Sequence, residues 1–139
     1  MSWLTWALLS AFFAAITAIL AKVGVQEISS NLATAIRTTV VLVLAWAVAW
    51  ATMPSSAISG ISRRALLFLV LSGLATGLSW LCYFRALQMA PVSKVAPLDK
   101  LSLPLAILLA TVFLGERSSS REWAGIGLMV CGTLVLAWK

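Results

Sequence analysis

Four charged residues lie inside long apolar stretches of the sequence. Arg37 is six residues into the second apolar run, and Arg85 is five residues from the end of the third. Asp99 and Lys100 are seven and eight residues into the fourth run. At 1.5 Å per helical residue, all four residues would lie at similar depths of roughly 8–12 Å. Such a layer of charge predicts either an ion pair or a binding site.

Asp99 is the only acid in this set, and Arg37 or Arg85 is its expected partner, because intramembrane charges pair or face a cavity. Asp99 and Lys100 are consecutive, so they point about 100° apart on a helix and cannot face one target. In one interpretation, Asp99 forms a structural ion pair and the other cations snorkel to the interface. In the other, the surplus cations bind an anionic or zwitterionic ligand group, and Asp99 is a titratable switch.

A polar stripe follows one face of the third run. Ser72, Thr76, Ser79 and Tyr83 are spaced four, three and four residues apart, and Trp80 lies beside them. Lipid offers no hydrogen-bond partners, so this face should meet protein or a water-filled path. We expect Thr76, Ser79, Trp80 and Tyr83 to line a substrate path. A helix-packing seam is an equally good interpretation.

Two prolines interrupt the fourth run. Pro97 and Pro104 lack the N–H that would bond to the carbonyls of Ser93 and Lys100. Broken helices with freed carbonyls are typical of transporter binding sites, whereas a packing kink is the simpler alternative. In the fifth run, Gly125, Leu128 and Gly132 share one face, and the two glycines permit close approach of another helix. We expect that face to form a dimer interface.

The composition indicates which structural elements carry these residues. Of the 139 residues, 62% are hydrophobic and only 10% are charged, which excludes a soluble enzyme and a nucleic-acid-binding domain. With about 20 residues per span, the chain forms an all-α integral membrane protein with five helices in a single domain over residues 1–139. The expected helices are about 3–23, 31–53, 65–90, 92–115 and 121–138. The chain has no histidine, and both cysteines lie in apolar runs, so we expect no metal, no cofactor and no catalytic residues.

The loop charges are nearly balanced between the two sides of the membrane. Side A is defined as the side of Met1, and side B is the opposite side. Side A holds four loop cations, which are Arg63, Arg64, Arg117 and Arg121; side B holds three, which are Lys22, Lys94 and Lys139. Adding Arg37, Arg85 and Lys100, which lie within a few turns of side B, makes the count four against six, so the sign of the difference depends on the counting window. Because a clear Lys/Arg excess on one side sets orientation, this near balance indicates insertion in both orientations.

The order of several short motifs resembles one EamA-type repeat of the drug/metabolite transporter superfamily. These motifs are Tyr83-Phe84-Arg85-Ala86-Leu87, Ala96-Pro97-Leu98, Pro104, Leu114-Gly115-Glu116, Trp123-x-Gly125 and Gly132. Most such proteins carry two five-helix repeats in inverted orientation, so the resemblance implies an antiparallel, dual-topology homodimer of ten helices. The glycine pattern of the fifth run is also similar to the small multidrug resistance family. That family's acidic residue in the first helix is missing here, so any proton coupling would fall to Asp99.

The sequence therefore predicts a multi-pass transporter in a bacterial plasma (inner) membrane. It would move a small polar metabolite or drug-like compound by alternating access, as a homodimer and without nucleic acid as a partner. A lipid-headgroup or lipid-carrier flippase is one alternative. The other is a non-transporting membrane subunit of a larger complex, which would have one fixed orientation and no ligand-dependent stabilisation.

Overall fold

The computed structural model describes residues 2–54, 60–117 and 119–138, and these residues are helical throughout except for short links. The all-α class is confirmed for this part of the chain. The helices are α1 (Trp3–Gly24), α2 (Ser30–Thr52), α3 (Arg63–Met89), α4 (Val92–Asp99), α5 (Ser102–Leu109), the π-helical turn η1 (Ala110–Leu114) and α6 (Ser120–Ala137). Lys139, counted above among the cations of side B, lies outside the described residues.

Within the described residues, four helical stretches are long and apolar enough to cross a membrane. They are α1, α2, α3 and the stretch Val92–Leu114, which comprises α4, α5 and η1. The helix α6 is 18 residues long, and its first turn contains Arg121 and Glu122, which lower its hydropathy. The fifth span therefore stays a prediction, although the residues expected to form it are helical.

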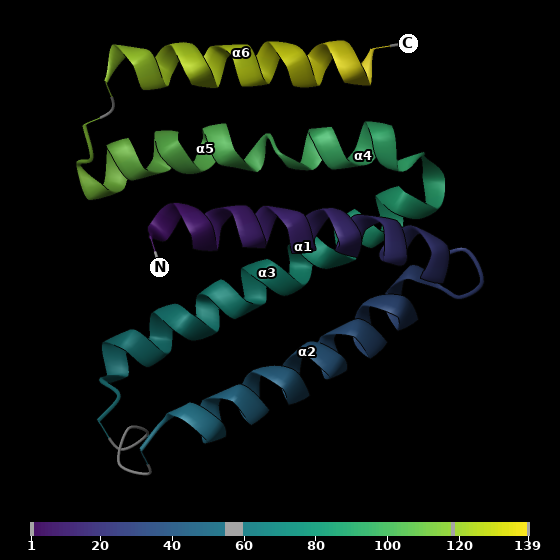
Figure 1. Cartoon of the computed structure of the whole chain (residues 1–139), viewed down its shortest axis with the longest axis vertical. Helices are drawn as coiled ribbons and strands as arrows, with labels where there is room; N and C mark the ends of the chain where they lie inside the picture. The colour runs from purple at the N-terminus through teal and green to yellow at the C-terminus, as the bar shows by residue number, and fades with distance from the viewer. Residues whose placement is uncertain (1, 55–59, 118, 139) are drawn as a thin grey trace. The chain divides into compact units, whose positions relative to one another are not determined.

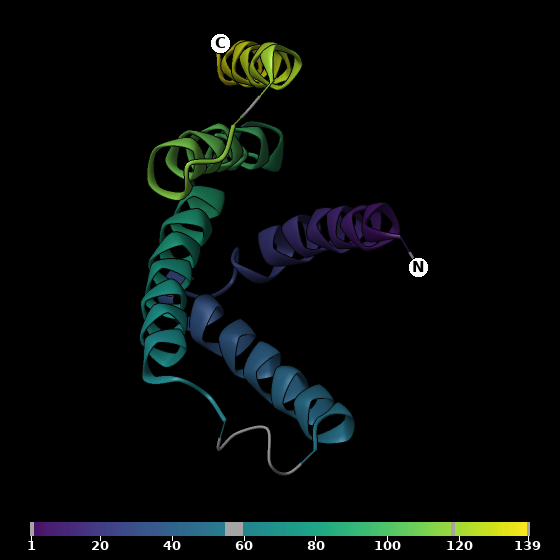
Figure 2. The same ribbon diagram turned by 90° about the vertical axis from the view of Figure 1, so that its left-hand side faces the viewer.

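The chain forms two compact units, residues 20–88 and residues 1–19 together with 89–139. In the first unit, α2 and α3 form a V (Figure 2), with the start of α2 near the end of α3. The buried residues of this unit lie at the closed end of the V, and the side chains of Val25 and Leu87 are fully buried there. This end of the unit thus has a packed core, whereas no residue described at the open end is buried.

In the second unit, α6 runs antiparallel to the α4–α5 stretch and contacts both helices (Figure 1). Val95 of α4 and Thr133 of α6 are buried. The start of α6 is fixed by a capping box, in which the Ser119 amide donates to Glu122 Oε2 at 2.6 Å and the Glu122 amide donates to Ser119 Oγ at 3.3 Å. These two bonds satisfy N–H groups that have no partner within the helix.

The fourth apolar run is interrupted between α4 and α5, at Lys100 and Leu101 (Figure 1). Pro104 lies in the first turn of α5 and cannot donate to the Lys100 carbonyl, which accepts instead from the Leu103 amide at 3.0 Å. Pro97 lies inside α4, which continues past it to Asp99. The interruption thus falls between the two prolines.

The π-helical turn η1 ends at Gly115, whose φ of 68° is the left-handed conformation that favours glycine. The amide of the next residue, Glu116, donates back to the Ala110 carbonyl at 3.3 Å. This turn closes the stretch Val92–Leu114 and directs the chain toward α6.

Candidate functional site

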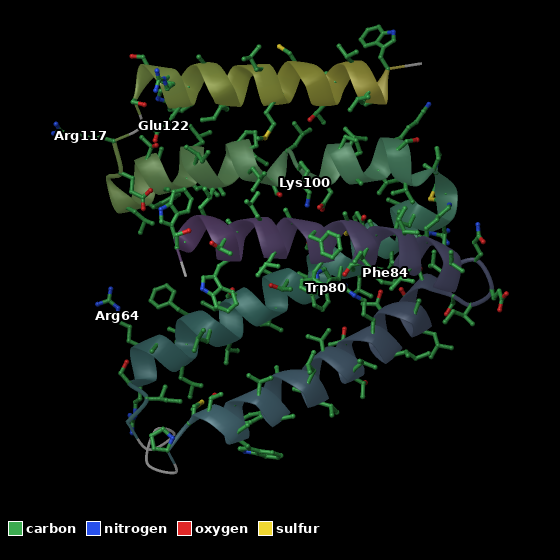
Figure 3. All side chains as sticks on the ribbon, viewed as in Figure 1. Arg64, Trp80, Phe84, Lys100, Arg117 and Glu122 are labelled. Atoms are coloured by element: carbon green, nitrogen blue, oxygen red, sulfur yellow. The ribbon has the colours of Figure 1, made fainter. Side chains whose placement is uncertain are left out.

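Arg37 lies over two aromatic rings in the unit formed by residues 20–88. Its guanidinium carbon Cζ is 4.2 Å from the centroid of the Trp80 ring and 5.6 Å from that of the Phe84 ring. The two rings project from neighbouring turns of α3 (Figure 3). Such a cation–π contact contributes about 0.5–1 kcal/mol at an exposed site and about 2 kcal/mol when the cation is desolvated, and half-buried Arg37 lies between these cases. The arrangement holds a permanent positive charge in place between two apolar helices.

The helical spacing of the sequence produces this geometry. Trp80 and Phe84 are four residues apart, so they share one face of α3. Phe84 is 3% exposed and belongs to the packed end of the V, while Trp80 and Arg37 are half-buried. Arg37 lies seven residues after the start of α2 at Ser30, which is about 10 Å along the helix axis. Phe84, which is fixed in the packed core, thus supports the guanidinium of Arg37.

The charge of Arg37 is not neutralised by a carboxylate within the part of the chain that the structure describes. The ion pair found among these residues joins Lys100 Nζ to Asp99 Oδ2, at 3.4 Å. A guanidinium has five N–H donors in a planar fork, and contact with an aromatic face leaves the edges of the fork for other partners. Carboxylates and phosphates match that fork with two parallel hydrogen bonds. Arg37 can therefore bind an anionic group.

The residues of the polar stripe predicted on α3 differ in how far they are exposed. Thr76 and Ser79 are exposed, and the Thr76 hydroxyl donates to the Ser72 carbonyl at 2.9 Å within the helix. Tyr83 is half-buried, and its ring packs edge-on against Phe84 at 6.4 Å between centroids. The structure therefore brings Arg37 to Trp80 and places Tyr83 beside the same phenylalanine. Thr76 and Ser79 lie on the stretch of α3 that leads away from this cluster.

Arg85 is engaged elsewhere, near the end of α3. Its Nη1 donates to Gln88 Oε1 at 3.2 Å, and the amide nitrogen of Gln88 donates to the carbonyls of Val25 and Ile28 at 3.1 and 2.8 Å. Gln88 thus ties the link between α1 and α2 to the end of α3. The predicted pairing of Asp99 with Arg37 or Arg85 would join two separate units, and it stays a prediction.

Lys22 makes a second connection at the same end of the unit. Its Nζ donates to the Leu87 carbonyl at 2.5 Å. Leu87 is in the last turn of α3, where carbonyls have no partner within the helix and a positive charge is favoured. Lys22 was counted above only as a loop cation, so its role as a helix cap was missed.

Sequence reasoning also missed Phe84 and Gln88 as parts of the site. The sequence does contain a pattern that points to both residues. Trp80, Phe84 and Gln88 follow one another at four-residue spacing, so they lie on one face of α3. The hydroxyl groups of the polar stripe gave no indication of this row, because Phe84 carries no polar group.

The predicted dimer face of α6 is open in its own unit. Leu128 is 76% exposed, and a Cβ atom added at Gly125 or Gly132 would meet no atom within 4 Å. Thr133, which is buried, lies on a different face of the helix. The residues that contact α4 and α5 thus leave Gly125, Leu128 and Gly132 free for another partner.

Comparison with known proteins places the sequence in a family. The model of the EamA-like transporter family matches residues 1–138. A Sinorhizobium protein described as an uncharacterized transporter in the cobO 3' region is 51% identical over 136 residues, which cover 98% of this chain and 96% of that protein.

A Yersinia pseudotuberculosis protein is 32% identical over 71 residues, and a Yersinia pestis protein shows the same identity over the same length. Both are named as the probable 4-amino-4-deoxy-L-arabinose-phosphoundecaprenol flippase subunit ArnE. The match covers 51% of this chain and 62% of each relative, which is less than two thirds of their length. No solved structure matches the chain. The family match and the Sinorhizobium relative both extend over nearly the whole sequence, and the chain therefore belongs to the EamA-like transporter family.

Proposed function

We propose that the chain transports a small polar metabolite or drug-like compound that carries an anionic group, by alternating access. The observation that supports this proposal best is the Arg37 guanidinium, held over Trp80 and Phe84 about 10 Å inside the second apolar helix. A charge at mid-membrane costs about 2.5–3.5 kcal/mol on insertion scales. Arg37 would be retained at that cost because it binds the anionic group of the substrate.

The neighbouring residues supply the other contacts in this proposal. Thr76, Ser79 and Tyr83 offer hydroxyl groups for the polar part of the compound, and the Trp80 ring offers an apolar surface. Arg85 and Lys100, which the sequence predicts as further cations of the site, make their observed contacts elsewhere, with Gln88 and with Asp99 of the other unit. Asp99 is the one acid of the sequence that lies within a candidate span, so it is the candidate for coupling transport to protons.

We further propose that the working unit is an antiparallel homodimer in the bacterial inner membrane. The near balance of loop cations on the two sides supports two orientations of the same chain. The open face of α6 at Gly125, Leu128 and Gly132 would form the interface, because a second helix can approach closely there.

A ligand screen tests the proposed substrate class. Purified protein is heated with carboxylates, phosphates, neutral compounds and organic cations, and its melting temperature is measured. We expect the stabilising compounds to carry a carboxylate or a phosphate, with about 2.7 kcal/mol of stabilisation at 100-fold excess over Kd. Uptake of these compounds into proteoliposomes then establishes transport. If only hydrophobic cations stabilise the protein, the proposal is wrong.

Orientation is tested by adding positive charge to one side at a time. One variant replaces Gly60 and Ile61 by lysines on side A, and the other adds two lysines after Lys139 on side B. Each variant should be fixed in one orientation and lose transport, and co-expression of the two should restore it. If each variant alone keeps full activity, the antiparallel dimer is contradicted.

A second candidate function is the flipping of a lipid-linked compound, because two relatives are named as subunits of a flippase. A flippase would be stabilised by polyprenyl phosphates and other amphiphiles rather than by soluble metabolites. The same screen therefore separates the two functions when both classes of compound are included.

A further inference from the structure

A polar cavity of about 510 Å³ lies where the link between α1 and α2 meets the last turns of α3. From α3 it is lined by Arg85 and Gln88. The remaining lining residues are consecutive, and they are Gln26, Glu27, Ile28, Ser29, Ser30 and Asn31. All but Ile28 are polar, and the cavity is wide open to its surroundings.

The cavity has one cation and one anion in its wall. Arg85 and Glu27 are both exposed, and no ion pair joins them among the described residues. Arg85 uses one nitrogen for Gln88 Oε1, which leaves other N–H groups of its fork for a ligand. The wall thus offers both a positive and a negative group to a ligand that carries both charges.

The position of the cavity indicates where such a ligand comes from. Its residues follow the end of α1 at Gly24, begin α2 at Ser30 and precede the end of α3 at Met89. Since three apolar helices of membrane-spanning length end or begin here, the cavity would lie at the level of lipid head groups. Leu32, next in sequence to Asn31, is 50% exposed and offers apolar surface to acyl chains. Arg37 is about 10 Å further along α2, so the two sites are separate.

We propose that this cavity binds the head group of a zwitterionic phospholipid that contains a phosphate and a primary amine. Arg85 donates hydrogen bonds to the phosphate, and the Glu27 carboxylate accepts from the ammonium group. A free phosphoamine shares this chemistry, but it lacks the acyl chains that can lie against Leu32. The bound lipid would fasten the link between α1 and α2 to α3, independently of any substrate at Arg37.

The test measures the melting temperature of the full chain, purified in detergent, during titration with defined compounds. These are phosphatidylethanolamine, phosphatidylglycerol with the same acyl chains, and soluble O-phosphoethanolamine. We expect phosphatidylethanolamine to stabilise the protein at the lowest concentration. Arg85→Gln should raise the half-maximal concentration for both lipids about tenfold. Arg64→Gln, at the other end of α3 (Figure 3), is the matched control and should change neither.

Glu27→Gln gives the sharper result, because Glu27 is exposed and its replacement leaves the packed core intact. We expect this variant to bind phosphatidylglycerol as well as phosphatidylethanolamine, since the group that recognises the amine is gone. If Glu27→Gln keeps the wild-type preference, or if the wild type has none, the proposal is overturned. It is also overturned if O-phosphoethanolamine acts at the same concentration as the lipid, because the ligand is then the free compound.

Discussion

Replacing Arg37 by glutamine is expected to weaken the binding of an anionic substrate about 100-fold, which corresponds to about 2.7 kcal/mol. The reason is that glutamine cannot supply the charge or the two parallel hydrogen bonds of a guanidinium. Binding is measured by isothermal titration with a carboxylate or phosphate compound identified in the ligand screen. Transport of that compound into proteoliposomes should fall in parallel.

Arg37→Lys separates the charge from the geometry of the fork. Lysine keeps the positive charge but makes neither the bidentate contact nor the same stacking on Trp80, so we expect an intermediate loss of about tenfold. Trp80→Leu removes the ring that lies 4.2 Å from the guanidinium carbon and should also weaken binding. Arg64→Gln is the control, because Arg64 is exposed at the far end of α3.

These variants also distinguish a ligand site from a structural contact. A purely structural role for Arg37 would lower the melting temperature of the ligand-free protein and leave the affinity of the surviving folded protein unchanged. A binding role predicts in addition a loss of the ligand-induced shift and of affinity in the folded protein, beyond the fall in melting temperature caused by losing the contact with Trp80. Wild-type affinity in Arg37→Gln would show that the anionic group binds elsewhere in the protein.

The helices themselves could be predicted from the sequence because a bilayer permits few backbone conformations. A backbone in hydrocarbon must satisfy its own hydrogen bonds, so each long apolar run becomes a helix. The same argument predicts how deep Arg37 lies within its apolar run. Trp80 stood out because it lies well inside its run, away from the interfacial positions where tryptophan is usual. Local composition and spacing were sufficient for both residues.

The contacts between helices could not be predicted in the same way. Lys22 and Leu87 are 65 residues apart in sequence, and Gln88 and Val25 are 63 apart. No local periodicity indicates which carbonyl a lysine reaches after two helices have packed. The Asp99–Lys100 contact was also unexpected, because consecutive helical residues point in different directions. It forms at the end of α4, where Lys100 leaves the helix and its long side chain can turn back.

The contact of Lys22 with the end of α3 leads to the second large effect. Lys22→Met is expected to lower the free energy of unfolding by about 2–3 kcal/mol, because the variant loses a charge-assisted hydrogen bond and a favourable charge at a helix C-terminus. The Leu87 carbonyl is then left without its 2.5 Å partner in a region that is partly buried. Unfolding is followed by tryptophan fluorescence during denaturation in mixed micelles.

Two companion variants determine whether this loss arises from the contact at the end of α3. Gln88→Leu removes the two hydrogen bonds to the link after α1, which hold the same end of the unit. Because both residues join α1 and its link to α3, the double variant should lose less stability than the sum of the two single variants. Arg117→Met, in the exposed loop before α6, removes one positive charge without either contact and should change stability by less than about 0.5 kcal/mol. If Lys22→Met is no less stable than Arg117→Met, then Lys22 acts only as an interfacial charge and the end of α3 is held by Gln88 alone.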